Sequence, residues 1–359
     1  MRVGIVGAGL WARRAHLPAF VHVPGIEIVA ISDPDLPRAQ QLARDFHVPQ
    51  AVADFREVLA TGIDMISIVA PDDTHHEIAS AALRERLPVL CEKPLARTIE
   101  EAGDLAALAE AARVPTKIGF IFRYSPALQR LKELVVDGYV GRIHTFVTYS
   151  QNPQFMDPEI PLHWKMVRER TGGGVFVEYG SHSLDLSRWI VGELREVCGN
   201  ARTVVPERLN PSTGRLEQIG VEDVCSWLAS FDGLAEGVFH TSWASLAQPW
   251  ADLAVFGDRG ALAWRRTDEQ WPFAELLGAT TADRVFRPVQ IPPRLVEGLE
   301  WATSWRECFA GNLVRRFVAE AQGSLPEEGP TFADGLRAQA GLAAIAASLA
   351  QRRWVTVPR

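Results

Sequence analysis

The first third of the sequence alternates short apolar runs with segments of helical period. The apolar runs end at turn residues and cover residues 2–8, 26–32, 65–71, 87–93 and 115–121. Between two of them, helical spacing places Leu36, Ala39, Leu42, Ala43 and Phe46 on one face. This alternation is typical of parallel strands joined by crossover helices, so it predicts an α/β fold with a doubly wound Rossmann sheet over residues 1–122.

The first apolar run leads directly into a glycine-rich turn at residues 7–12, with the pattern GxGxxA. Gly7 permits a tight turn, Gly9 lets the backbone approach a pyrophosphate, and the small Ala12 lets the next helix pack on the sheet. The start of a helix also favours anions. The predicted cofactor contacts here are Gly7, Ala8, Gly9, Leu10 and Trp11.

Asp33 follows the second apolar run, 24 residues after Gly9. A carboxylate at this place accepts hydrogen bonds from the adenosine ribose hydroxyls and repels a 2′-phosphate, so NAD is favoured over NADP. Two alternatives stay open. Asp33 could simply open a turn with Pro34, or Ser32 and Arg38 could support a 2′-phosphate.

The third and fourth apolar runs deliver polar residues to the same predicted edge of the sheet. Pro71, Asp72 and His75 follow one run, and Glu92 and Lys93 end the next. Ligands of open α/β sheets bind outside the carboxyl ends of the strands, so all five lie at the expected ligand crevice, and Pro71, Asp72 and His75 are predicted to contact the cofactor. Alternatively, Lys93 is an exposed charge at a strand end.

Residues 123–359 show a different pattern and are predicted to form an α+β domain with a large, mostly antiparallel open sheet. A proline-rich stretch over residues 151–174 predicts a long loop, in which Trp164 and Lys165 either contact substrate or pack. After a glycine triplet, one helix is expected over residues 175–191. It places Glu178 and His182 on one face, as a surface pair, a core pair or metal ligands.

Together these motifs resemble the glucose-fructose oxidoreductase, inositol dehydrogenase and rhizopine catabolism (Gfo/Idh/MocA) family. The resemblance rests on GxGxxA, Asp33, the turn from Pro71 to His75, the sequence EKP at residues 92–94, and a glycine triplet followed by an acid and a histidine. It implies that Lys93 is catalytic beside the nicotinamide and that Glu92 contacts the cofactor. It also makes His182 a site residue, with Glu178 where the family usually has aspartate.

The resulting hypothesis is an NAD-dependent dehydrogenase that acts on a secondary hydroxyl of a sugar, inositol or related polyol. Lys93, His182 and Glu178 are the predicted catalytic residues, and either Lys93 or His182 moves the proton. The predicted substrate contacts are Arg123, Tyr124, Trp164, Lys165 and His182. Two alternatives remain: an NADPH-dependent sugar-ketone reductase, and a cofactor-sensing regulator without turnover.

The composition restricts the partners. A net charge of −7 with no basic cluster argues against nucleic acid or an anionic membrane surface. No apolar segment reads as a signal peptide or membrane span, so a cytoplasmic protein is expected. The four scattered cysteines have neither disulfide nor metal spacing. The family resemblance implies a homodimer or homotetramer formed through the C-terminal sheet.

Overall fold

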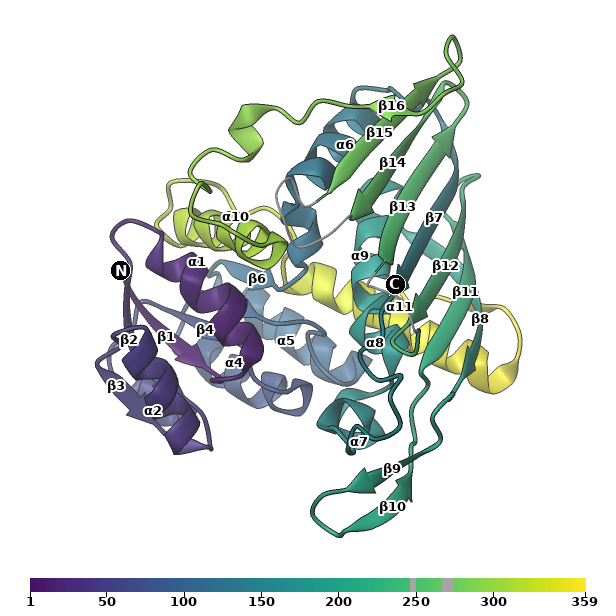
Figure 1. The fold of residues 1–359 in the computed structure, drawn as a ribbon. Helices are drawn as coiled ribbons and strands as arrows, with labels where there is room; N and C mark the ends of the chain where they lie inside the picture. The colour runs from purple at the N-terminus through teal and green to yellow at the C-terminus, as the bar shows by residue number, and fades with distance from the viewer. Residues whose placement is uncertain (246–249, 267–273) are drawn as a thin grey trace. The chain divides into compact units, whose positions relative to one another are not determined.

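The computed structural model describes residues 1–245, 250–266 and 274–359. They form two compact units (Figure 1). The first contains Met1–Ser125 and Val296–Leu336, and the second contains Pro126–Leu295 and Arg337–Arg359. These units differ from the predicted division at residue 122, because the segment from Val296 to Leu336 packs with the N-terminal part of the chain.

The first unit contains a six-stranded parallel sheet with the order β3-β2-β1-β4-β5-β6. Its strands are β1 (Arg2–Val6), β2 (Glu27–Ser32), β3 (Gln50–Val52), β4 (Met65–Ile68), β5 (Val89–Cys91) and β6 (Thr116–Ile118). The helices between them are α1 (Leu17–Val21), α2 (Leu36–Asp45), α3 (Phe55–Leu59), α4 (His75–Arg84) and α5 (Ile99–Ala112). The predicted doubly wound Rossmann sheet is therefore confirmed, with the short strand β3 in addition.

The strand order reverses direction between β1 and β4, which is the switch point where open α/β sheets bind ligands. Single turns follow the strands here. A π-helical turn, η1 (Ala12–His16), precedes α1, and a 3-10 turn, η2 (Asp72–Thr74), precedes α4. Pi-helical turns occur frequently at functional sites. Here the turn brings His16 into the interior, where its side chain is only 2% exposed.

Helix α10 (Trp305–Ala321) and the segment after it complete the first unit. Helix α10 begins in a capping box formed by Ser304 and Glu307. The segment that follows runs beside β6, since the Ile118 amide donates to the carbonyl of Pro330. The fully buried Lys117 amine lies 2.7 Å from a Glu320 carboxylate oxygen. An ionic contact thus fastens α10 to the edge of the sheet.

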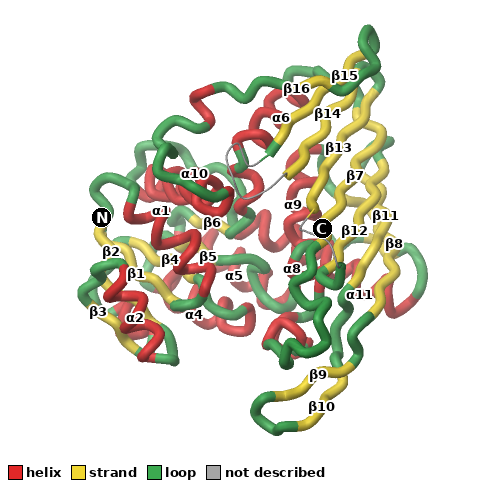
Figure 2. The backbone as a smooth tube through the Cα atoms, in the orientation of Figure 1, coloured by secondary structure: helices red, strands yellow, loops and turns green. Residues whose placement is uncertain are grey.

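The second unit contains a nine-stranded sheet with the order β16-β15-β14-β13-β7-β12-β11-β8-β17. The strands are β7 (Ile143–Gln151), β8 (Leu194–Arg202), β11 (Val224–Phe231), β12 (Glu236–Ser242), β13 (Trp250–Gly257), β14 (Gly260–Arg266), β15 (Glu275–Thr280), β16 (Arg287–Pro288) and β17 (Val355–Thr356). Among the described strands of this sheet, only β7 and β12 pair in parallel. The predicted large, mostly antiparallel sheet is therefore confirmed. A separate hairpin joins β9 (Glu207–Asn210) to β10 (Arg215–Gln218) (Figure 2).

Helices cover one face of this sheet (Figure 1). They are α6 (Pro126–Val136), α8 (Val175–Glu178), α9 (Gly180–Ile190) and α11 (Phe332–Gln351), of which α11 begins in the first unit. The buried face carries Trp227 of β11, Phe239 of β12 and Leu253 of β13. Strand residues alternate between the two faces, so their sequence neighbours Leu228, Val238 and Ala254 lie on the opposite face.

That opposite face carries an apolar row. Strand pairing places seven residues side by side across the sheet: Cys198, Leu228, Val238, Val147, Ala254, Ala263 and Leu277. Leu228 is 47% exposed and Val238 is 45% exposed. No helix of the described residues covers this face in Figure 1. We call these seven residues the outer row.

Two sequence predictions about helices differ from the structure. The single helix expected over residues 175–191 is broken at Tyr179, which separates α8 from α9. The expected long loop over residues 151–174 contains a 3-10 turn, η4 (Trp164–Met166), and a short helix, α7 (Arg168–Thr171). Two further 3-10 turns are η3 (Ile121–Tyr124) and η5 (Pro293–Leu295).

Candidate active site

The glycine-rich turn after β1 is closed on one side and open on the other. Gly7 has φ of +104°, and a Cβ atom on it would lie 2.3 Å from the carbonyl oxygen of Val69 at the end of β4. A Cβ atom on Gly9 would have no neighbour within 4 Å. Gly7 therefore permits the contact between the ends of β1 and β4, and Gly9 leaves its backbone accessible. This geometry fits a dinucleotide phosphate approaching the backbone.

Asp33 joins this turn to the end of β2. Its Oδ2 atom accepts a hydrogen bond of 2.9 Å from the Ala8 amide, and its Oδ1 atom accepts one of 2.9 Å from the Asp35 amide. Each carboxylate oxygen has a second lone pair for a ribose hydroxyl. Arg38 lies 3.8 Å from Asp33 and 2.8 Å from Asp35, so its guanidinium is already paired with carboxylates.

Glu92, at the end of β5, is held by a hydrogen-bond network that the sequence did not predict. Its Oε1 atom is 2.9 Å from Trp11 Nε1 and 2.9 Å from His16 Nε2. The other ring nitrogen of His16 is 2.8 Å from the Ser67 hydroxyl of β4. Glu92 Oε2 accepts the Lys93 amide at 3.2 Å. The glycine-turn helix, β4 and β5 are thereby joined at their common edge.

The network favours the ionised form of Glu92. Burial alone would raise the pKa of this carboxyl, because desolvation penalises the charge. The hydrogen bond and charge of His16, the charge of Lys93 and the bond from Trp11 outweigh burial, so the pKa lies below its ordinary value. Glu92 is therefore a fixed negative charge at the carboxyl edge of the sheet.

Lys93 follows Glu92 and is half-buried. The next residue, Pro94, is joined to it by a cis peptide bond. The Nδ1 atom of His75 is 2.8 Å from the Pro94 carbonyl, and Nε2 is 3.0 Å from the Ala70 carbonyl. His75 thus links the ends of β4 and β5 and positions the backbone around Lys93. Burial lowers the pKa of His75 despite these hydrogen bonds.

Other predicted residues of the first unit lie as follows. Leu10 is 61% exposed, and Asp72 is buried at the start of η2, directly after Pro71. Arg123 is buried and donates to Asp334 at 3.1 Å. Tyr124 is also buried, and burial raises the pKa of its hydroxyl. Arg123 is thus held in an ion pair, and the substrate contacts expected for Arg123 and Tyr124 stay predictions.

In the second unit, the glycine triplet fixes the start of α8. Gly172 ends α7 with φ of +77°. A Cβ atom on Gly174 would lie 2.3 Å from the Glu222 carbonyl oxygen. The Gly174 amide donates to the Glu222 carboxylate at 2.7 Å. Burial raises the pKa of Glu222 in spite of these amide hydrogen bonds. The triplet is required sterically, and it sets where Glu178 lies at the end of α8.

The structure brings two predicted site residues into direct contact. The amine of Lys165 lies 2.6 Å from Glu178 Oε1, and the side chains are 21% and 15% exposed. The same amine lies 5.6 Å from the centre of the Trp164 ring. His182 follows on α9, one turn beyond the break at Tyr179, and is half-buried. Glu178 is thus an ion-pair partner of Lys165.

His163 is a further candidate that the sequence analysis missed. Its Nδ1 atom accepts a hydrogen bond of 3.3 Å from the Lys165 amide, which caps η4. Burial and the charge of Lys165 lower the pKa of this imidazole. The neutral ring therefore carries its proton on Nε2. A short polar residue before a 3-10 turn is a capping signal that can be recognised in a sequence. Histidine is an uncommon cap, so the sequence did not indicate this role for His163.

A buried arginine outside the loop holds the chain that leads to His163. Arg208 of β9 is 1% exposed, and its guanidinium donates to the carbonyl oxygens of Asp157 at 2.7 Å and Ile160 at 3.0 Å. It also donates to the Phe155 carbonyl. The Leu162 amide donates to the Leu209 carbonyl at 2.9 Å. The loop is therefore fastened to the hairpin of β9 and β10.

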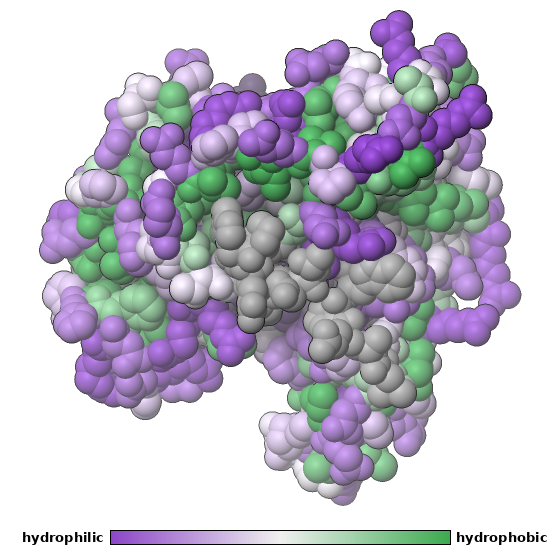
Figure 3. Space-filling view, turned by 45° about the horizontal axis from the view of Figure 1, so that its top comes forward, coloured by the Kyte–Doolittle hydropathy of each residue, from purple (hydrophilic) through white to green (hydrophobic). Residues whose placement is uncertain are grey.

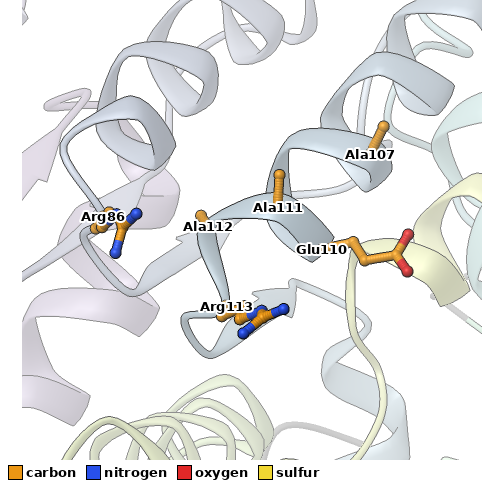
Figure 4. A pocket seen from close by; sticks show the side chains of 6 residues that line it. All are labelled: Arg86, Ala107, Glu110, Ala111, Ala112 and Arg113. Carbon is orange, nitrogen blue, oxygen red and sulfur yellow. The ribbon is translucent and has the colours of Figure 1, made fainter.

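A hollow of about 460 Å³ lies elsewhere in the first unit (Figure 4). Its lining comes from the ends of α4 and α5, with Arg86, Ala107, Glu110, Ala111, Ala112 and Arg113. These residues precede β5 and β6, so the hollow is at the amino ends of the strands. It is separate from the predicted cofactor residues, which follow the carboxyl ends.

Two features are absent from the described residues. No group of three or more His, Cys, Asp or Glu side chains among them could hold a metal ion. None of the helices in the described ranges is long and apolar enough to cross a membrane. The face seen in Figure 3 shows hydrophilic residues interspersed with smaller hydrophobic areas.

Comparison with known families identifies the chain. Residues 1–120 match the model described as the oxidoreductase family with an NAD-binding Rossmann fold (GFO_IDH_MocA), and residues 128–263 match the GFO/IDH/MocA C-terminal domain. The chain belongs to the Gfo/Idh/MocA family. It is accordingly an NAD-binding oxidoreductase, as the resemblance implied.

Individual members of the family are similar over most of the chain. Levoglucosan dehydrogenase of Pseudarthrobacter phenanthrenivorans is 28% identical, with 100% of this chain and 98% of that protein aligned. The NAD-dependent scyllo-inositol 2-dehydrogenase of Bacillus subtilis is 27% identical over 73% of each chain.

Solved structures of the family have the same fold. Levoglucosan dehydrogenase in complex with NADH and levoglucosan has a TM-score of 0.91 and 26% identity, with 100% of both chains covered. An oxidoreductase domain protein from Kribbella flavida has a TM-score of 0.89 and 27% identity over 99% of both chains.

Proposed function

We propose that this dehydrogenase oxidises a secondary hydroxyl of an uncharged sugar, inositol or related polyol, or reduces the corresponding ketone. The cofactor assignment rests on the glycine-rich turn at the switch point of the sheet. In this turn a Cβ atom on Gly7 would collide with the backbone at the end of β4, whereas one on Gly9 would have no neighbour within 4 Å. The substrate assignment rests on the relatives, which are named as dehydrogenases of levoglucosan and inositols.

On the cofactor side, the chain offers a place for each part of NAD. The amides after Gly7 would hold the phosphates, and Asp33 would accept from the ribose hydroxyls. Pro71, Asp72 and Glu92 would surround the nicotinamide. When bound, this group accepts or supplies a hydride. The paired carboxylates around Arg38 support the preference for NAD over NADP.

On the substrate side, Lys93 and His182 have the chemistry to handle the hydroxyl proton. A neutral amine or imidazole takes the proton as the hydroxyl is oxidised, and a charged Lys93 stabilises the developing alkoxide. Glu92 beside the Lys93 amide and the backbone contacts of His75 would hold Lys93 in position. Trp164 and Lys165 would contact the polyol, with Glu178 orienting Lys165.

The test is NADH formation by the purified protein on a panel of sugars and inositols. We expect turnover with at least one uncharged polyol. Lys93→Ala should lose turnover while still binding NADH, as measured by fluorescence titration. Full turnover by Lys93→Ala would contradict the catalytic role of Lys93. NADH binding with no turnover on the whole panel would contradict the proposed function and favour a cofactor sensor.

The assembly and cellular location belong to the same proposal. The exposed outer row of the large sheet supports a homodimer or homotetramer in which this face is covered by a second copy. The four cysteines, Cys91, Cys198, Cys225 and Cys308, are free. Free thiols agree with a cytoplasmic protein, because that compartment keeps them reduced.

A further inference from the structure

The Lys165 amine and the Glu178 carboxylate form a contact between opposite charges in the second unit. Their side-chain atoms are 2.6 Å apart and less than a quarter exposed. Glu178 ends α8, whose start is fixed by the glycine triplet and Glu222. Lys165 lies in η4, whose first residue is capped by His163. Both partners are therefore held by backbone structure, unlike a pair of mobile surface side chains.

A histidine and an arginine lie near this pair. His163 is neutral, because burial and the Lys165 charge lower its pKa. The Arg170 guanidinium lies 5.7 Å from the centre of the Trp164 ring, and the Lys165 amine lies 5.6 Å from it. Without the Glu178 charge, Lys165 and Arg170 would make this surface positive.

We propose that the Lys165 and Glu178 pair selects for uncharged substrates, with Glu178 cancelling a cation that would otherwise bind a sugar carboxylate. This inference rests on the proposed function and adds the determinant of its substrate class. Glutamate reaches Lys165 where the usual aspartate of the family would be one methylene shorter. The additional methylene places the Glu178 carboxylate oxygen within hydrogen-bonding distance of the Lys165 amine.

The proposal makes Glu178 a specificity residue that acts through charge. Substituting it by glutamine keeps the shape of the side chain and leaves the Lys165 amine without its carboxylate. A desolvated ammonium then attracts an anionic group of the ligand. Lys165→Met has the opposite effect, because it removes one positive charge. The double variant Lys165→Met with Glu178→Gln removes one charge of each sign, so its local net charge is that of the unmodified protein.

The experiment uses D-glucose and D-glucuronate, which differ only at carbon 6, where an uncharged hydroxymethyl group is replaced by a carboxylate. Dissociation constants for both sugars are measured by calorimetry on the full-length protein saturated with NADH. For Glu178→Gln we expect the constant for D-glucuronate to fall about tenfold relative to that for D-glucose, a change typical of one charge-assisted contact. Lys165→Met should shift the ratio the other way. The double variant should return to the ratio of the unmodified protein.

An unchanged ratio in Glu178→Gln, including no measurable binding of D-glucuronate, would overturn the proposal. So would a double variant that keeps the ratio of Glu178→Gln, because a merely structural role has no reason to be cancelled by a second substitution. Glu193→Gln, which removes a carboxylate 2.7 Å from Arg188 elsewhere in the unit, is the matched control. Circular dichroism checks that each variant is folded.

Binding ratios separate this inference from the proposed function. If the unmodified protein forms no NADH on any polyol, the proposed function fails, whatever the sugar affinities are. If it turns over a polyol but the ratios do not follow the charge at residue 178, only the selection by Lys165 and Glu178 fails.

Discussion

The Nε2 atom of His16 lies 2.9 Å from Oε1 of Glu92, and both side chains are buried. The histidine belongs to the π-helical turn after the glycine motif, and the glutamate ends β5. A hydrogen bond between them couples the part of the unit expected to hold phosphates to the part expected to hold nicotinamide. The ionised state of Glu92 depends on this contact.

Replacing Glu92 by glutamine should therefore lower the free energy of unfolding at pH 7 by about 1 to 3 kcal/mol, the usual effect of weakening a buried charged hydrogen bond. The folded protein holds the pKa of Glu92 below its ordinary value of 4.5. The stabilisation is thus present above that pH and is lost as the pH falls through the lower folded value. Urea unfolding at several pH values measures it.

The control for this experiment is Glu100→Gln, at an exposed position of α5. It should change the free energy of unfolding by less than about 0.5 kcal/mol at pH 7. A difference between the Glu92 variant and the unmodified protein that grows as the pH is lowered from 5 to 3 would contradict the assigned direction.

The two glycines of the nucleotide turn should respond differently to alanine. Gly7→Ala places a Cβ atom 2.3 Å from a backbone oxygen at positive φ, so we expect a loss of about 3 kcal/mol in stability or failure to fold. Gly9→Ala meets open space and should melt within a few degrees of the unmodified protein. Its affinity for NADH should nevertheless fall at least about tenfold, because the added methyl group occupies the approach to the backbone.

Thermal melting and NADH fluorescence titration of the two variants test this contrast. Unchanged NADH affinity in a folded Gly9→Ala protein would show that the phosphates bind elsewhere.

His75 should make stability dependent on pH near neutrality. Burial keeps its pKa below 6.5 in the folded protein, so the unfolded chain binds a proton more readily. Stability is then fully present above about pH 6.5 and decreases as the pH falls, by at most about 1.4 kcal/mol per pH unit from this residue. His75→Gln should be less stable at pH 7.5 and should lose less stability on going to pH 5.5.

Denaturant unfolding at both pH values provides the comparison, with His144→Gln at an exposed position of β7 as the control. The control should follow the unmodified protein. Equal losses for the His75 variant and the unmodified protein would exclude His75 as the titrating group.

The buried pair of Lys117 and Glu320 should be far more sensitive than a surface pair. Glu320→Gln leaves a fully buried ammonium without its carboxylate, which typically costs about 3 to 5 kcal/mol. Asp283→Asn breaks an exposed pair with Arg287 and should cost about 0.5 kcal/mol or less. Thermal unfolding of both variants tests the order. Similar effects would mean that the amine of Lys117 finds another partner.

The outer row predicts how assembly can be disrupted. The double variant Leu228→Glu with Val238→Glu places two charges side by side on adjacent strands, because these residues are register partners. We expect a smaller species by light scattering coupled to size-exclusion chromatography. Leu234→Glu, at a 73% exposed position in the turn between β11 and β12, is the control and should leave the mass unchanged. An unchanged mass for the double variant would place the interface elsewhere.

Local sequence patterns predicted much of the fold. The Rossmann sheet followed from apolar runs separated by helical segments, and residues 7–12 showed a strand-to-helix turn. The break at Tyr179 could not be predicted from periodicity, because the apolar and polar spacing continues through it. The start of α8 is fixed by Glu222, which lies 48 residues from Gly174 in sequence. The strand β3 was missed because three half-exposed residues carry no periodic signal.

The site was predicted less completely, for a related reason. Asp33 and Glu92 come at the ends of predicted strands, so the sequence alone places them at the edge of the sheet. His16 and His163 stand inside or before helical turns and are recognised only through their partners in space. Lys165 and Glu178 were both predicted, but their contact depends on how the loop and α8 meet, which sequence spacing does not reveal.

The conformation of the loop before His163 is specified partly from outside the loop, by the three carbonyl contacts of Arg208. Transplanting residues 151–174 into a related enzyme would therefore transfer the side chains without their geometry. Any exchange that is meant to preserve the loop conformation therefore has to include the β9–β10 hairpin that carries Arg208.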